Sequence, residues 1–273
     1  MSESIINILT IGRSGSSAVS KFISEFDDCL LSDNLPGLDE YNAKGYFEDG
    51  FINSLNENYL KDINHDIWET KELSNDDINL FHEKYKPQLK SYLESYYKPN
   101  KNFIIKNPRI YKLFEIYNEL LYESSFSNVY HIFLFRHPDS FSESANIIRE
   151  NSIVEYDNAY ESWYYLTYKV FEAFKENDNV ILISFEDFTN NLDETRNRLE
   201  NFLGLSIKEE SFQQYKTNFF DNKLIHHIND KPVGNEYLND MYLYLIDNIN
   251  KNHNEIKNEK LSEWKHNLNF ILS

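Results

Sequence analysis

A short apolar run followed by a glycine–serine loop constrains this chain more than any other stretch. Residues 5–11 are apolar except for Asn7 and Thr10, a composition typical of a strand buried on both faces. The loop that follows reads Gly12-Arg13-Ser14-Gly15-Ser16-Ser17. Apolar residues at helical spacing come next, at Ala18, Val19, Phe22, Ile23 and Phe26. The segment therefore predicts a strand, a loop and a helix in direct succession.

The residues of this loop are suited to binding an anion. A glycine loop between a strand and a helix directs backbone N–H groups and the positive end of the helix dipole toward a phosphate. The serine hydroxyls add donors, and Arg13 adds a fixed positive charge. The loop is not a Walker A motif, because Gly15 is followed by serine and not by lysine. A strand-to-helix turn capped by serines is the alternative interpretation.

Further strands and helices alternate along the chain. Buried strands are expected at residues 103–106, 129–135 and 180–183. A loop is expected over residues 29–45, and Asn75 is the expected N-cap of a helix. The expected helices cover residues 51–60, 76–97, 109–122, 139–149, 157–174, 193–203, 236–249 and 261–272. This alternation predicts an α/β fold with a P-loop-like central parallel sheet flanked by helices and a mainly helical C-terminal part.

The chain shows no internal repeat and no linker. We therefore expect one domain over residues 1–273, with a nucleotide-binding core at 1–205 and a helical C-terminal extension at 206–273.

Cations stand at the ends of three of the four predicted strands, at Arg13, Lys106 and Arg136. Ligands of parallel sheets bind outside the carboxyl ends of the strands, so these side chains should meet there. Ser144 follows Arg136 by eight residues, and two helical turns can bring its hydroxyl back to the strand end. Arg136 and Ser144 thus form a candidate second phosphate site. Two phosphate sites on one nucleotide indicate a 3′,5′-bisphosphate and not a triphosphate.

Composition excludes several classes of partner. The chain has 27 Lys and Arg against 45 Asp and Glu, a formal net charge of −18, which makes nucleic acid an unfavourable partner.

The one cysteine, Cys29, cannot form an internal disulfide. No apolar run approaches the roughly 20 residues that span a bilayer, and the stretch before Ile5 is too short for a signal peptide. We expect a soluble, cytoplasmic protein. The histidines lack metal-ligand spacing, so no metal site is predicted.

These motifs, taken in order, resemble the sulfotransferase superfamily that uses 3′-phosphoadenosine 5′-phosphosulfate (PAPS), and its bacterial members in particular. Residues 10–17 are similar to the family's 5′-phosphosulfate loop, and Arg136 with Ser144 has the spacing of its 3′-phosphate motif. Residues 106–109, Lys-Asn-Pro-Arg, resemble a Lys-Asp-Pro-Arg stretch of bacterial members. Similar segments occur at residues 45–49, 184–188 and 202–205. Residues 206–273 match no motif of the family.

The resemblance implies a sulfotransferase with PAPS as donor and a small-molecule or carbohydrate hydroxyl as acceptor. It implies that residues 12–17, Arg136 and Ser144 bind the donor, and that Arg13 and Lys106 stabilise the charge on the leaving phosphate. Eukaryotic cytosolic members carry lysine where Arg13 stands and a catalytic histidine where Pro108 stands. A histidine base is therefore excluded at that position.

Glu48 is the candidate general base, because related enzymes without the histidine use a carboxylate after the first helix. The cations Arg13 and Lys106 would favour its ionised form. Capping of the next helix is the alternative role of Glu48, and Asp49 is the other possible base. Lys106 has the alternative of a purely structural ion pair, and Arg109 is expected to brace the Asn-Pro turn.

Two other functions remain open from the sequence. One is a kinase-like P-loop nucleotide-binding protein, which the missing Walker lysine and the absence of an Asp-ended strand for magnesium disfavour. The other is a catalytically silent nucleotide-binding scaffold with the same fold.

Overall fold

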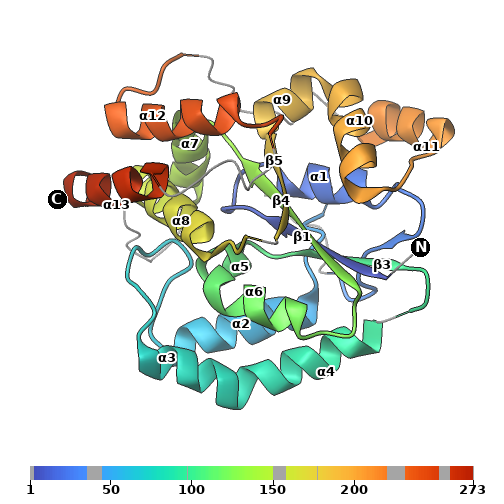
Figure 1. Cartoon of the computed structure of the whole chain (residues 1–273), viewed down its shortest axis with the longest axis horizontal. Helices are drawn as coiled ribbons and strands as arrows, with labels where there is room; N and C mark the ends of the chain where they lie inside the picture. Colours follow the sequence, from blue (N-terminus) through green and yellow to red (C-terminus); the bar gives the residue numbers. More distant parts are fainter. Residues whose placement is uncertain are drawn as a thin grey trace.

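A parallel five-stranded sheet lies at the centre of the molecule (Figure 1). The computed structural model describes residues 3–35, 45–96, 98–149, 158–176, 178–219, 231–251 and 259–272. The strand order is β2-β3-β1-β4-β5, and every neighbouring pair is parallel. The strands are β1 (Ser4–Leu9), β2 (Cys29–Leu30), β3 (Asn102–Lys106), β4 (Asn128–Phe135) and β5 (Asn179–Ser184). The predicted α/β fold class is confirmed.

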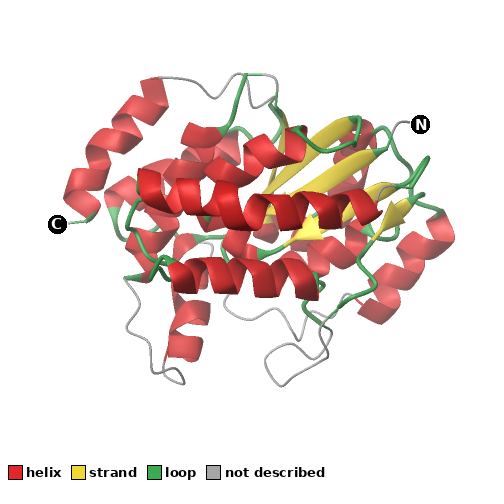
Figure 2. Cartoon of the chain, turned by 90° about the horizontal axis from the view of Figure 1, so that it is seen from below, coloured by secondary structure: helices red, strands yellow, loops and turns green. Residues whose placement is uncertain are grey.

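Both faces of the sheet are covered by helices, as the apolar strands require. In β1, Ile5 and Leu9 join one hydrophobic cluster, whereas Ile6 and Ile8 join the other. Seen from below, long helices lie in front of the strands (Figure 2). The period of two along β1 therefore divides the core into two layers.

The larger cluster lies against one set of helices and the smaller cluster against another. The first set comprises α2 (Gly50–Asp62), α3 (Asn75–Leu80), α4 (Lys86–Tyr96), α5 (Pro108–Lys112), α6 (Phe114–Tyr122), α7 (Pro138–Arg149), α8 (Ala159–Ala173), α12 (Glu236–Asp247) and α13 (Glu259–Ile271). The second set comprises α1 (Ser16–Ile23), α9 (Phe185–Asn190), α10 (Leu192–Leu203) and α11 (Glu209–Gln214). Two π-helical segments complete the described elements, η1 (Phe81–Tyr85) and η2 (Tyr215–Phe219).

One strand was not predicted. Residues 29–45 were expected to form a loop, but Cys29 and Leu30 pair with Asn102 and Phe103 as the edge strand β2. A strand of two residues has too short an apolar pattern to be recognised. Residues 36–44 of that loop lie outside the described residues.

Two helix predictions are wrong in their details. Ser74, and not Asn75, is the N-cap of α3, because Ser74 and Asp77 form a reciprocal capping box. The helix expected over residues 109–122 is two helices, since Leu113 has φ −101° and ψ 13° between α5 and α6. The helix expected over residues 193–203 corresponds to α10, which Gly204 ends with a left-handed φ of 64°. Among the described residues, none of the helices combines the length and apolar character needed to cross a bilayer.

The strand order decides where the candidate site residues lie. Because β1 stands between β3 and β4, the segments that follow these three strands share one edge of the sheet. Arg13, Lys106 and Arg136 are therefore delivered to adjacent positions.

Candidate active site

The loop after β1 has a backbone that depends on glycine. Gly15 is the N-cap of α1 with a φ of 77°, and Arg13 is also left-handed, with a φ of 70°. A Cβ atom on Gly15 would lie 2.0 Å from the Phe185 ring, so no other residue fits without rearrangement. N–H groups in the first turn of a helix lack intrahelical acceptors. The loop and the start of α1 therefore have the geometry that the sequence predicts for anion binding, which stays a prediction.

Arg13, Arg136 and Ser144 meet beside this loop. Arg13 Nε donates to Ser144 Oγ at 3.2 Å, and Arg136 Nη1 donates to the Arg13 carbonyl at 3.0 Å. The Arg136 guanidinium lies 5.2 Å from the centroid of the Phe185 ring. Burial lowers the pKa of Arg136, and the nearby Glu186 carboxylate opposes this shift. Arg13, from the glycine loop, thus contacts both Arg136 and Ser144, the two residues that the sequence predicts at a second phosphate site.

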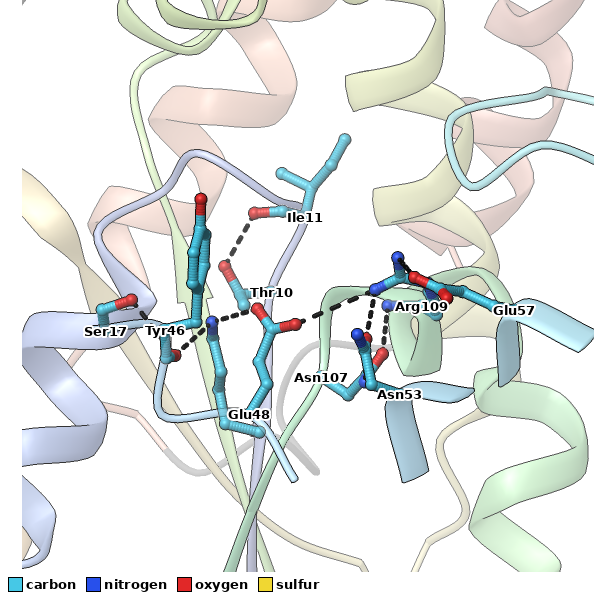
Figure 3. Close-up of polar contacts among 10 residues, drawn as sticks. Thr10, Ile11, Ser17, Tyr46, Glu48, Asn53, Glu57, Asn107 and Arg109 are labelled. Carbon is cyan, nitrogen blue, oxygen red and sulfur yellow. Dashed lines mark hydrogen bonds and ion pairs between the residues drawn. The ribbon is translucent and has the colours of Figure 1, made fainter. Parts of the chain in front are cut away.

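Lys106 contacts the segment that carries Tyr46 and Glu48, and this segment in turn contacts the glycine loop of residues 12–17. Its Nζ donates to Glu48 Oε1 at 2.6 Å and to the Tyr46 carbonyl at 2.9 Å. The same carbonyl accepts a hydrogen bond from Ser17 Oγ at 3.2 Å (Figure 3). Burial lowers the pKa of the Lys106 ammonium, and the charge of Glu48 opposes this shift. Lys106 therefore lies between the loop and the candidate base, paired with the latter.

Arg109 lies on the other side of Glu48 (Figure 3). Its Nη1 donates to Asn53 Oδ1 at 2.5 Å and lies 3.8 Å from Glu48 Oε2, and its Nη2 donates to Glu57. Asn107 caps α5 by accepting the Arg109 N–H, and its amide donates to Asn53 at 3.0 Å. Arg109 braces the Asn-Pro turn, as expected, and also approaches the candidate base.

The two acidic residues at the start of α2 have different partners. Asp49 is the N-cap, because its Oδ1 accepts the Ile52 N–H at 2.8 Å. Its Oδ2 accepts hydrogen bonds from the Tyr92 hydroxyl at 2.6 Å and from the Ser32 hydroxyl. The alternative capping role of Glu48 is therefore wrong. Asp49 is committed to holding the segment in place, whereas Glu48 is directed toward the two cations.

Trp68 is a residue of this region that motif analysis did not identify. A Cβ atom on Gly12 would lie 3.6 Å from its indole, and Trp68 is 8% exposed. The Ser162 hydroxyl donates to its carbonyl at 2.5 Å. The signal available in the sequence was a single tryptophan in the polar stretch 61–75. Trp68 forms an apolar wall next to the loop.

The histidines of the described segments do not form a metal centre. Within those segments, no group of three His, Cys, Asp or Glu residues is placed to hold a metal ion. His131 is fully buried, and its Nδ1 forms a hydrogen bond with Asn7 Nδ2 at 3.2 Å.

The family model described as "Sulfotransferase family" matches residues 6–209 of this chain. The chain belongs to the sulfotransferase family. The match covers about three quarters of its length and includes the glycine loop of residues 12–17, Glu48, Lys106, Arg136 and Ser144. The region beyond residue 209, which matched no motif, lies outside it.

Solved structures that resemble this chain include three sulfotransferases. The sulfotransferase domain from the olefin synthase of Synechococcus PCC 7002 is 18% identical, with 88% of this chain and 87% of that chain covered and a TM-score of 0.46. The sulfotransferase domain from the curacin biosynthetic pathway is 19% identical, with 78% of each chain covered and a TM-score of 0.45. A sulfotransferase from Alicyclobacillus acidocaldarius is 12% identical, with coverages of 80% and 87% and a TM-score of 0.45. No match to a curated protein was found.

Proposed function

We propose that this member of the sulfotransferase family transfers the sulfuryl group of PAPS to a hydroxyl of a small-molecule or carbohydrate acceptor. The observation that carries the proposal is the convergence of Arg13, Lys106 and Arg136 at the ends of three adjacent strands, around the glycine loop. The chain as a whole has a net charge of −18. A local positive site in so acidic a protein favours a small anionic ligand over a polyanion.

The residues at the strand ends support PAPS as the sulfuryl donor. The Ser14 hydroxyl is fully buried and has no hydrogen-bond partner among the described residues, as expected of a group that binds a ligand. In the proposal, residues 12–17 hold the 5′-phosphosulfate, and Arg136 with Ser144 holds the 3′-phosphate. When bound, PAPS supplies a sulfuryl group whose leaving group is a phosphate.

The protein's own residues then have distinct roles in the proposal. Arg13 and Lys106 stabilise the negative charge that grows on the leaving phosphate. Glu48 takes the proton of the acceptor hydroxyl while a new S–O bond forms and the bond from sulfur to the phosphate oxygen breaks. No step calls for a metal ion, because the sulfuryl group carries less charge than a phosphoryl group.

We also propose that the protein acts in the cytoplasm. Cys29 is buried, and burial raises the pKa of its thiol to about 12. A buried, protonated thiol is an unreactive one, which suits a protein that needs no disulfide in a reducing compartment.

Incubation of the purified protein with sulfur-labelled PAPS and a fractionated cell extract tests the function. The expected result is a labelled organic product that forms in the presence of EDTA and is missing with the Glu48→Gln variant. Binding of adenosine 3′,5′-bisphosphate without transfer to any fraction would instead support the silent scaffold. Transfer of phosphate from ATP that requires magnesium would support the kinase-like alternative.

A further inference from the structure

The two oxygens of Glu48 have different surroundings. Oε1 accepts a hydrogen bond from Lys106 at 2.6 Å, whereas Oε2 lies 3.8 Å from Arg109 Nη1, beyond hydrogen-bond length. The side chain of Glu48 is 10% exposed and that of Lys106 is 2% exposed. The carboxylate is therefore buried between one cation that binds it and a second that is close to doing so.

In the proposed reaction, two anions need the Lys106 ammonium: Glu48 in the unliganded site, and the leaving phosphate once PAPS has bound. Two of its three N–H donors already serve Glu48 and the Tyr46 carbonyl. A leaving phosphate at the neighbouring loop competes for the same ammonium. If Lys106 turned away and no other cation replaced it, a buried carboxylate would be left uncompensated and would take up a proton.

Arg109 is placed to prevent that outcome. Its guanidinium is held along α2 by Asn53 and Glu57, which are four residues apart and so share one face of the helix. Glu57 is 53% exposed, so it binds Arg109 against the competition of water. A small movement of either side chain brings Nη1 within hydrogen-bond length of Glu48 Oε2.

We propose that Arg109 is a positioning residue that takes over Glu48 when the donor engages Lys106. It then keeps the carboxylate ionised and orients it toward the acceptor. This inference rests on the proposed function, because it assumes that the donor's 5′-phosphate contacts Lys106.

Proton uptake on ligand binding is the direct test. Binding of adenosine 3′,5′-bisphosphate at pH 6.5 is followed by calorimetry in two buffers that differ in their heat of ionisation. Arg109→Gln should take up as much as about one proton more than the wild type, since one carboxylate then loses its second cation. In the Glu48→Gln background, Arg109→Gln should cause no additional uptake. Phosphates of the ligand titrate at about pH 6, and comparison at matched pH cancels them.

Two further variants separate charge from structure. Arg109→Lys keeps a cation and should stay near the wild-type proton count. Asn53→Asp leaves Arg109 in place but offers its Nη1 a competing carboxylate. Proton uptake should therefore rise when Asn53→Asp is the only change, and should not rise when it is combined with Glu48→Gln. Asn53→Asp also keeps the test open if Arg109→Gln does not fold.

The possible failures can be distinguished from one another. The role of Arg109 would be overturned, and the proposed function left intact, by either of two results. One is unchanged proton uptake in both Arg109→Gln and Asn53→Asp, and the other is a rise in uptake that is equal in the wild-type and Glu48→Gln backgrounds. Absence of any bisphosphate binding by the wild-type protein would overturn both.

Discussion

The site has two sides that are built by different means. In the proposed function, residues 12–17, Arg136 and Ser144 form the donor side. The base side is formed by Glu48, Lys106, Arg109 and the α2 residues Asn53 and Glu57. On the donor side, the loop backbone and the ends of β1 and β4 place the cations, and Arg136 donates to a main-chain carbonyl. On the base side, ion pairs join Glu48, in the segment before α2, to Lys106 and Arg109, and join Arg109 to Glu57. The donor side therefore has a shape set by the main chain, whereas the base side is held by side-chain ion pairs, which the proposed role of Arg109 requires to exchange.

Glu48→Gln gives the largest expected effect and breaks the base side alone. The glutamine keeps the size of the side chain and an acceptor oxygen for Lys106 but cannot take a proton. Turnover should fall about 10²–10⁴-fold, while affinity for adenosine 3′,5′-bisphosphate stays nearly unchanged. The measurements are transfer of labelled sulfuryl groups and calorimetric binding.

Asp49→Asn is the matched control at the adjacent position. Asparagine caps a helix about as well as aspartate, but it replaces the charged acceptor of the Tyr92 and Ser32 hydroxyls. The free energy of unfolding should therefore fall by about 1 kcal/mol, with turnover largely retained. A Glu48→Gln variant that stays active and only melts at lower temperature would remove Glu48 from the chemistry.

Arg136→Ala breaks the donor side. Affinity for adenosine 3′,5′-bisphosphate should fall by about 1.5–3 kcal/mol, the value of a hydrogen bond to a charged group, and affinity for adenosine 5′-phosphate should fall much less. Arg196→Ala is the control, since Arg196 pairs with Glu200 and Glu209 on α10 and α11. Equal losses for the two nucleotides would show that Arg136 does not read the 3′-phosphate.

Two glycines test whether the donor side depends on its backbone. Gly15 and Gly204 are both left-handed, but a Cβ on Gly15 would collide with Phe185, whereas nothing lies within 4 Å of one on Gly204. Gly204→Ala should lower the free energy of unfolding by about 1–2 kcal/mol, from backbone strain alone. Gly15→Ala should lower it further and also weaken bisphosphate binding. Thermal denaturation and calorimetry measure the two effects, and equal losses in both variants would contradict a crowded loop.

The smallest expected effect concerns His65, which lies outside both sides. Its buried ring is 3.7 Å from Glu69 and 3.8 Å from Asp77, and burial nevertheless lowers its pKa below the usual 6.5. Lys112 and Lys71 add to this shift. The unfolded chain then binds a proton more readily than the folded one, so stability should fall as the pH drops below about 6.5.

Denaturation between pH 7.5 and pH 5.5 checks this expectation. His65→Gln should flatten the pH dependence in that range. A wild-type stability that rises on acidification would mean that the two carboxylates outweigh burial.

The convergence of Arg13, Arg136 and Ser144 could be predicted from the sequence because it follows from recognisable local patterns. Arg13 and Arg136 come directly after apolar strands, and parallel pairing then brings them together. The edge strand β2 could not be predicted, because its two residues, Cys29 and Leu30, show no periodicity.

The base side was predictable only in part. Glu48 and Lys106 were selected individually, but their direct pairing depends on where the segment before α2 lies relative to the end of β3. The approach of Arg109 to Glu48 across Asn53 likewise follows from tertiary packing, which no local pattern encodes. Trp68 was missed for the same reason, since its contact with Gly12 joins distant parts of the chain.

Calorimetric titration with adenosine 3′,5′-bisphosphate in the presence of EDTA tests the central claim most directly. The wild-type protein should bind adenosine 3′,5′-bisphosphate without any divalent ion and more tightly than adenosine 5′-phosphate. The Arg136→Ala variant should lose this preference. ATP binding that requires magnesium, together with no binding of the bisphosphate, would contradict it.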